Sequence, residues 1–167
     1  AGGSFTFMNP EKIRAMNDLA HEYGVLVSTG GFMEYVLTKG KESVKKYIEE
    51  VKSLGFDIIE ISTGFISIPT SDWQRVIEEV QKAGLKAKPE IGVQFGAGGD
   101  TAAGELRQEG IQDVDYAIRQ AKQFLDAGAY LIMMESEGVT ENADPWRMDV
   151  PAKFINGLGL EKVMFEA

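Results

Sequence analysis

Four glutamates stand at nearly the same place in a repeated sequence pattern. Each follows a glycine by five to seven residues and ends an apolar run that is typical of a β-strand. They are Glu60, Glu90, Glu135 and Glu166. If these strands are parallel, their carboxyl ends meet at one edge of a sheet, where gathered carboxylates repel one another. We therefore expect these carboxyls to be protonated, paired with cations or bound to a hard metal such as Mg²⁺, unless each glutamate merely caps the turn that follows it.

The strand that ends in Glu90 also carries two lysines. Lys86, Lys88 and Glu90 share one face of an extended strand, because successive side chains alternate between its two faces. If Glu90 points into the site, Lys88 does too, where a buried ammonium can do acid–base work or fix an anionic substrate. We therefore assign catalysis to Lys88 and Glu90, and the metal ion to Glu60, Glu90 and Glu135. The alternative is a bulged or shifted strand that leaves Lys88 in solvent or in a structural pair with a glutamate.

Two further features are suited to the anionic part of a ligand. Gly30 and Gly31 follow the first predicted strand, and backbone N–H groups in such a turn can cradle an anion. Arg147 closes a long loop over residues 136–146 and could clamp an anion. Each has a simpler reading, since a tight turn needs glycine for its backbone conformation and Arg147 could pair with a neighbouring acid. A second long loop, residues 92–112, is typical of a lid or binding loop.

The elements that position these residues form a serial α/β pattern. Amphipathic helix, glycine, apolar strand and polar turn recur, with glycines 29 to 44 residues apart at the expected helix ends. The glycines are Gly24, Gly55, Gly84, Gly128 and Gly159. The five predicted strands are VLVSTGG, FDIIEISTG, LKAKPEIG, AYLIMMESEG and LEKVMFEA. Such repeats make a parallel sheet, either open and doubly wound or closed as a (β/α)8 barrel, and periodicity alone does not separate the two.

The helices carry apolar stripes at the 3.6-residue period, so each is expected to pack one face on the sheet. The stripes are Val44, Tyr47, Ile48 and Val51; Trp73, Val76, Ile77 and Val80; and Val114, Ala117, Ile118 and Ala121. Asn9 before Pro10 predicts one helix start, and Ser71 with Gln74 predicts another as a capping box. His21 falls near the end of the first helix, at the edge of the sheet opposite the glutamates, and is expected on the surface.

Composition narrows the possible functions. The 167 residues include no cysteine and one histidine, which excludes thiolate zinc sites, cysteine nucleophiles and multi-histidine metal sites. The net charge of −9 argues against binding to nucleic acid or to an anionic membrane surface. No apolar run approaches the roughly 18 residues of a transmembrane helix, and the first residues do not resemble a signal peptide. We therefore expect a cytoplasmic protein with no membrane and no nucleic-acid partner.

Several phrases of the sequence resemble the phosphosulfolactate synthase family. They are VLVSTGGFMEYVLTKGKESVKKYIEEVKSLGFDIIEIS, LKAKPEIG, LDAGAYLIMMESEG and LEKVMFEA. Within the family they resemble the branch that includes a plant heat-stress-associated protein. The resemblance implies a (β/α)8 TIM barrel, of which residues 1–167 form a single-domain central portion with about five parallel strands and without the flanking ones. A closed barrel takes at least about 200 residues, which agrees with an incomplete portion.

The resemblance also implies an activity and a set of ligands. The reaction is a Mg²⁺-dependent addition of sulfite to phosphoenolpyruvate on the way to coenzyme M, or a related reaction on a phosphorylated enol or 2-oxo acid. Ser62, which ends the Glu-Ile-Ser phrase, then joins the residues expected to bind the small phosphorylated substrate, which are Gly30, Gly31 and Arg147. A homo-oligomer is expected, because an incomplete barrel also exposes sheet edges that need covering.

Three positions depart from the pattern of the family. Synthases carry aspartate where this chain has Thr63, a lysine pair where it has Val93 and Gln94, and Gly-Arg where it has Ser136 and Glu137. Two of these changes remove positive charge from a site that is expected to bind anions. Two other functions therefore stand beside the enzyme: a non-catalytic heat-stress-associated protein that binds protein partners, and an open-sheet binding module.

Overall fold

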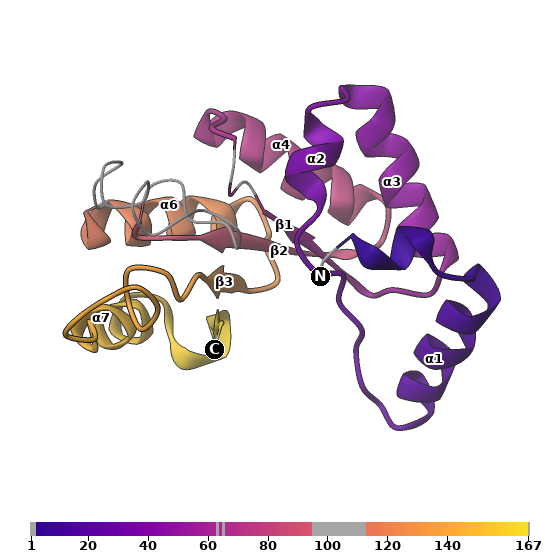
Figure 1. Cartoon of the computed structure of the whole chain (residues 1–167). Helices are drawn as coiled ribbons and strands as arrows, with labels where there is room; N and C mark the ends of the chain where they lie inside the picture. Colours follow the sequence, from indigo (N-terminus) through magenta and orange to yellow (C-terminus); the bar gives the residue numbers. More distant parts are fainter. Residues whose placement is uncertain (1–2, 63, 65, 95–112, 167) are drawn as a thin grey trace.

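Helices and short strands alternate through the described residues, which are 3–62, 64, 66–94 and 113–166 of a computed structural model (Figure 1). The α-helices are α1 (Pro10–Glu22), α2 (Met33–Leu37), α3 (Lys41–Ser53), α4 (Thr70–Lys82), α6 (Val114–Asp126) and α7 (Asp149–Leu158). The strands are β1 (Ile58–Ile61), β2 (Lys86–Ile91), β3 (Ile132–Met134) and β4 (Val163–Phe165), and the 3-10 helices are η1 (Ser4–Phe7) and η2 (Leu160–Lys162). In this part of the chain, no helix combines the length and the apolar character needed to cross a bilayer.

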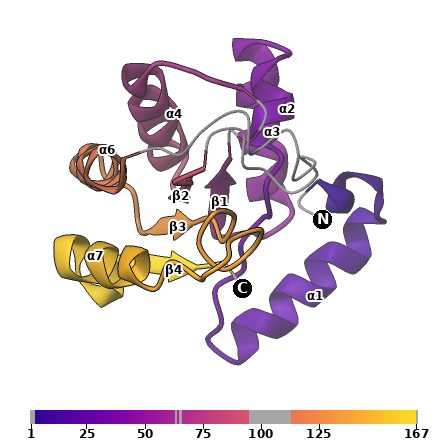
Figure 2. The same ribbon diagram turned by 60° about the vertical axis from the view of Figure 1, so that its left-hand side comes forward.

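The four strands form one parallel sheet in the order β1, β2, β3, β4, which is also their order along the chain. Figure 2 shows α3, α4, α6 and α7 following one another around the outside of the strands. A doubly wound sheet reverses its strand order at a switch point, whereas the strands of a (β/α)8 barrel keep chain order all the way round. The described strands show no reversal, so the sheet is part of an architecture of the (β/α)8 barrel type.

The first of the five expected strands is reduced to a single bridge. Within residues 25–31 there is one bridge, Ser28 opposite Ile58, made by the hydrogen bonds from the Thr29 N–H to the Ile58 carbonyl and from the Ile58 N–H to the Val27 carbonyl. Val25 and Leu26 are 54% and 46% exposed. The Val27 N–H donates to the Asp57 carboxylate at 2.7 Å instead of to a backbone carbonyl. A side chain thus replaces one bond of the ladder, and the described sheet has four strands where the sequence pattern predicts five.

The apolar core lies between the sheet and the helices. The predicted stripes of α3, α4 and α6 are buried there, except that Ile118 is half-buried. They belong to one cluster with alternate residues of the strands, which are Ile59, Ile61, Ala87, Ile91, Ile132 and Met134. Because side chains alternate along a strand, the residues between these point to the other face of the sheet. That inner face is where the polar side chains gather.

The helix ends agree with the sequence pattern with one exception. All five predicted glycines have positive φ, between 70° and 96°, and Asn9 caps α1 by accepting from the N–H groups of Glu11 and Lys12. The capping box at Ser71 is wrong. Helix α4 begins at Thr70, two residues earlier than a cap at Ser71 predicts, and its N-cap is Pro69, whose ring fixes φ at −57°. The Gln74 side chain instead donates to the Gln123 carbonyl of α6 at 3.4 Å.

A hydrogen bond between His21 and Asp57 joins α1 to the amino end of the sheet. His21 is exposed, as expected, but its Nε2 lies 2.8 Å from Asp57 Oδ2. Asp57 also accepts the Val27 N–H, so its carboxylate joins α1, residues 25–28 and the start of β1. Burial opposes ionisation of Asp57, but the hydrogen bonds from Val27 and His21 outweigh it and hold the pKa of Asp57 below its ordinary value.

Replacing Asp57 should therefore weaken the fold at this end. We expect Asp57→Ala to lower the free energy of unfolding by about 1–3 kcal/mol, because the Val27 N–H and His21 lose an ionised acceptor. Urea denaturation at neutral pH measures the change. Asp18→Ala, at an exposed position of α1, is the matched control and should stay within about 0.5 kcal/mol of the parent. Equal effects of the two substitutions would contradict a role for Asp57 in fastening α1.

Candidate active site

The strand register brings the predicted residues to one face. Glu60 lies opposite Lys88 in the pairing of β1 with β2, and Glu90 lies opposite Met133 in the pairing of β2 with β3. Lys88 and Glu90 are two residues apart, as are Met133 and Glu135, so all these side chains point to the inner face. The expected alternation along the Glu90 strand is thus confirmed. The register adds what alternation alone cannot give, namely which residues are neighbours across the sheet.

Lys88 is buried and paired with Glu60. Its Nζ lies 2.8 Å from Glu60 Oε2, and the two side chains are only 6% and 10% exposed. Lys88 is therefore not in solvent, and the pair with a glutamate is formed. Burying two charges costs free energy that their mutual attraction offsets only when both partners stay in place. The ion pair therefore places one fixed ammonium at the carboxyl end of the sheet.

Glu60 is held by its backbone as well as by Lys88. Its N–H donates to Thr29 Oγ1 at 3.0 Å, which ties β1 to the residues before the Gly30–Gly31 turn. Burial raises the pKa of Glu60, and the hydrogen bond and charge of Lys88 act in the opposite direction. Because Oε2 is committed to Lys88, Oε1 is the Glu60 oxygen that remains for a metal ion.

Glu90 and Glu135 are the carboxyls most affected by their surroundings. Burial raises the pKa of Glu90 to about 8, and the charges of Glu135, Glu60, Glu166 and Glu34 add to the effect. Burial also raises the pKa of Glu135 to about 7, helped by a hydrogen bond and repulsion from Glu166. These shifts are the electrostatic signature of carboxyls that converge on one place.

Glu135 is also held by the turn that follows it. The N–H groups of Ser136 and Glu137 donate to Glu135 Oε1 at 2.9 and 3.4 Å. On the neighbouring strand, the Glu166 N–H donates to the Met134 carbonyl at 3.0 Å, which places Glu166 beside Glu135 at the end of β4. The expectation that each glutamate caps its own turn therefore holds for Glu135, which does so while facing Glu166.

No ready-made metal cage is present in the described ranges, where no three acidic or histidine side chains are grouped closely enough to hold an ion. Mg²⁺ does not require one, since it is commonly bound by one or two carboxylates together with water and substrate oxygens. Glu90 and Glu135 provide two carboxyls on neighbouring strands whose repulsion a cation would relieve. Glu90 and Glu135 are therefore oxygen donors of the kind that Mg²⁺ takes in proteins.

The Gly30–Gly31 turn and Ser62 lie against this group. A Cβ added to Gly31 would lie 3.0 Å from Ser62 Oγ and 3.2 Å from Glu60 Oε1, so any larger residue would require these side chains to shift by a few tenths of an ångström. Ser62 Oγ donates to Glu34 Oε2 from the first turn of α2. Sequence reasoning missed Glu34, because nothing in its local pattern marks it and only the fold brings it to Ser62.

Arg147 pairs with an acid two residues later in the chain. Its guanidinium forms two hydrogen bonds with the Asp149 carboxylate, at 2.8 and 2.9 Å, and this pairing raises the pKa of Arg147. Its N–H donates to the Val139 carbonyl at 2.7 Å. The salt bridge with a neighbouring acid, which the sequence left as an alternative to anion binding, is therefore formed, and the partner of Arg147 is not one of the strand-end glutamates.

The loop after β3 brings a further buried acid to this end of the sheet. Glu137 is 4% exposed and accepts a hydrogen bond from Asn142 Nδ2 at 2.8 Å, while Ser136 Oγ donates to Glu141. Gly138 packs against the Gln94 side chain. Of the other positions that depart from the family pattern, Val93 is buried, whereas Thr63 and residues 95–112 of the expected second loop lie outside the described residues.

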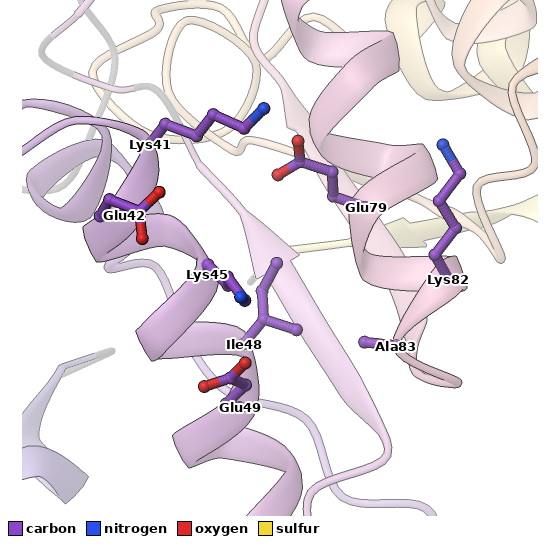
Figure 3. A pocket seen from close by; sticks show the side chains of 8 residues that line it. All are labelled: Lys41, Glu42, Lys45, Ile48, Glu49, Glu79, Lys82 and Ala83. Atoms are coloured by element: carbon purple, nitrogen blue, oxygen red, sulfur yellow. The ribbon is translucent and has the colours of Figure 1, made fainter.

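A separate groove of about 330 Å³ lies between α3 and α4 (Figure 3). Its lining is formed by Lys41, Glu42, Lys45, Ile48, Glu49, Glu79, Lys82 and Ala83. Most of these residues are charged side chains on the surface of α3 and α4, whereas Ile48 belongs to the buried stripe of α3. None of the predicted site residues is among them. The groove is therefore not part of the strand-end site.

Comparison with known proteins decides the family. The model of the family (2R)-phospho-3-sulfolactate synthase (ComA) matches residues 1–167, which is the whole chain. The chain belongs to the phosphosulfolactate synthase family. The resemblance inferred from the sequence phrases is therefore confirmed.

Curated proteins related to this phosphosulfolactate synthase family member include a plant protein and two archaeal enzymes. Protein HEAT-STRESS-ASSOCIATED 32 of Arabidopsis thaliana is 38% identical over 177 residues, covering all of this chain and 62% of its own length. Phosphosulfolactate synthases of Methanothermobacter thermautotrophicus and Methanocaldococcus jannaschii are 22% and 25% identical, each covering 99% of this chain and 62% and 64% of their own lengths. The chain thus spans about three fifths of the length of these relatives.

Solved structures support the fold of this family member. A phosphoenolpyruvate phosphomutase from Streptomyces platensis subsp. rosaceus matches 95% of this chain and 53% of its own, with a TM-score of 0.53 and 15% identity. An uncharacterized conserved protein from Geobacillus kaustophilus matches 96% of this chain and 66% of its own, with a TM-score of 0.51 and 13% identity. At these identities the likeness concerns the arrangement of helices and strands alone.

The raised pKa of Glu90 predicts how the stability of this synthase family member depends on pH in the absence of divalent cations. In the unfolded chain, Glu90 loses its proton near pH 4.5, whereas in the folded protein Glu90 keeps its proton up to about pH 8. The unfolded state therefore binds fewer protons over this range, and the free energy of unfolding should fall as pH rises from about 4.5 to 8. Glu90→Gln should flatten that decline, measured by urea denaturation across the range.

Glu49→Gln, at an exposed position on the outer side of α3, is the matched control for this experiment. It should leave the slope of stability against pH unchanged. A parent protein whose stability does not fall over this range, or a slope that is as steep in the Glu90→Gln variant as in the parent, would contradict the raised pKa of Glu90.

Proposed function

We propose that the strand-end site belongs to a phosphosulfolactate synthase-like lyase that forms a carbon–sulfur bond. It adds sulfite to phosphoenolpyruvate, or acts on a related phosphorylated enol or 2-oxo acid. The observation that carries the proposal is the buried Lys88–Glu60 pair at 2.8 Å, on the same face of the sheet as Glu90 and Glu135. Membership of the family over residues 1–167 supports this class of reaction.

Lys88 is the residue that meets the anionic substrate. Its ammonium has three N–H donors, and Glu60 takes one of them, which leaves two for a carboxylate or a phosphate. When the sulfite sulfur bonds to C3 of the enol, the π electrons of the C2–C3 double bond move to C2 and its carboxylate. The ammonium stabilises that charge, and transfer of a proton from Nζ to C2 completes the adduct.

Glu90 and Glu135 are the residues that would hold Mg²⁺, with Glu60 Oε1 as a further oxygen within the same group. Their carboxyls share one face of neighbouring strands, and mutual repulsion prepares them for a cation. A bound Mg²⁺ supplies positive charge for the carboxylate and phosphate of the substrate. Buried surroundings strengthen each of these electrostatic interactions relative to water.

A non-catalytic role in heat stress is the second candidate function. The observation that favours it is the 38% identity with the Arabidopsis heat-stress-associated protein, compared with 22% and 25% for the two archaeal synthases. Such a protein would keep the fold and bind other proteins instead of turning over a small molecule. Co-sedimentation with heat-aggregated proteins, and no saturable binding of phosphoenolpyruvate, are the results expected for it.

Phosphorus NMR tests the enzymatic proposal directly. With phosphoenolpyruvate, sulfite and Mg²⁺, we expect the protein to convert the enol phosphate signal into that of a saturated phosphate ester. Lys88→Met should lose at least about 100-fold in rate, because it removes the group that holds the charge and delivers the proton. Lys86→Met, two residues earlier on the same face of β2 and exposed, is the matched control and should keep the parent rate.

Circular dichroism of each variant accompanies these rates, since removing Lys88 leaves the Glu60 carboxylate buried without its partner. Full turnover by a folded Lys88→Met variant would contradict the role of Lys88. Absence of turnover in the parent protein, together with co-sedimentation with aggregated proteins, would favour the second candidate function.

A further inference from the structure

The end of β1 presents oxygen atoms to the Gly30–Gly31 turn. Ser62 follows Glu60 by two residues, so their side chains lie on the same face of the chain. The position of a Cβ on Gly31 is 3.0 Å from Ser62 Oγ and 3.2 Å from Glu60 Oε1. Both oxygens therefore lie beside the same point next to Gly31, and they form one wall of the strand-end site.

The Ser62 hydroxyl already donates a hydrogen bond within the protein. Ser62 Oγ donates to Glu34 Oε2, and Ser62 itself is buried. A hydroxyl has one proton, so a serine that donates to a carboxylate offers only lone pairs to any other group. In this state Ser62 cannot donate to a phosphate or sulfite oxygen, which changes the role expected for it from the sequence.

Glu34 also adds negative charge to the same group of residues. Burial raises the pKa of Glu60 and of Glu90 first, and the charge of Glu34 contributes to both shifts. On the other side of Glu60, Oε2 is taken by the Lys88 ammonium at 2.8 Å. The described part of the site is thus polarised, with acceptors and negative charge at Ser62 and Glu34 and the positive charge at Lys88.

We propose that Glu34 is a specificity-determining residue of the strand-end site. By holding the Ser62 proton, Glu34 makes the end of β1 a wall of acceptors, so the anionic groups of the ligand are turned away from Ser62 and directed to Lys88. The inference rests on the proposed function only for the phosphorylated nature of the ligand.

Isothermal titration calorimetry with inorganic phosphate, without sulfite or divalent cations, separates two effects of Glu34. One is its negative charge, and the other is the hydrogen bond that it accepts from Ser62. Glu34→Gln removes the charge but keeps an oxygen that accepts from Ser62. Glu34→Ala removes both, so the released hydroxyl can donate to phosphate. We expect Glu34→Ala to bind phosphate about tenfold more tightly than Glu34→Gln, which corresponds to one hydrogen bond to a charged group.

The same comparison in a Ser62→Ala background is the decisive control. There, Glu34→Ala and Glu34→Gln should bind phosphate equally, because no hydroxyl remains to be released. Glu42→Ala, in the exposed first turn of α3, controls for a general change of charge and should shift the affinity less than about twofold. Equal phosphate affinity of Glu34→Ala and Glu34→Gln with Ser62 present, or a difference that survives Ser62→Ala, would overturn the proposal. Because these titrations require no turnover, their outcome is independent of whether sulfite addition is observed.

Discussion

Lys88 and Glu60 face each other across β1 and β2, and the rest of the site is arranged around this buried pair. Parallel pairing fixes which residues are neighbours, and the alternation of side chains then carries Glu90 and Glu135 to the same face. The opposite face of each strand is apolar and packs against α3, α4 and α6. One face of the sheet therefore stabilises the fold, while the other holds charges whose burial costs free energy.

That division explains why the carboxyl end of the sheet is suited to chemistry. Three of its carboxyls, Glu60, Glu90 and Glu135, have pKa values raised mainly by burial, and each also feels the charge of its neighbours. Carboxyls held in this way favour protons, an ammonium or a divalent cation as partners, and Lys88 already supplies one ammonium. Carboxyls with shifted pKa values that are grouped at the end of a strand are a physical reason to seek function there.

Sequence periodicity predicted the elements well, because helix stripes, glycines with positive φ and strand alternation are local properties. It placed Lys88 and Glu90 on one face, but the pairing of Lys88 with Glu60 depends on register, which only the folded sheet supplies. Glu34 could not be predicted, since it lies 28 residues from Ser62 in the chain. The strand expected over 25–31 is limited to one bridge, and on either side of that bridge a side chain accepts a backbone N–H: Asp57 accepts that of Val27, and Thr29 that of Glu60. Strand propensity does not predict such side-chain hydrogen bonds.

The central claim is that Glu90 belongs to a group of converging carboxyls that accepts a cation. Carbon-13 NMR of the Glu90 carboxyl, followed against pH with and without Mg²⁺, tests it most directly. Without the cation we predict titration near pH 8, caused by burial and by the facing Glu135, Glu60, Glu166 and Glu34. With saturating Mg²⁺ we predict that the midpoint falls by at least about two units, since the cation favours the ionised form. A midpoint near 4.5 that Mg²⁺ does not move would contradict the account.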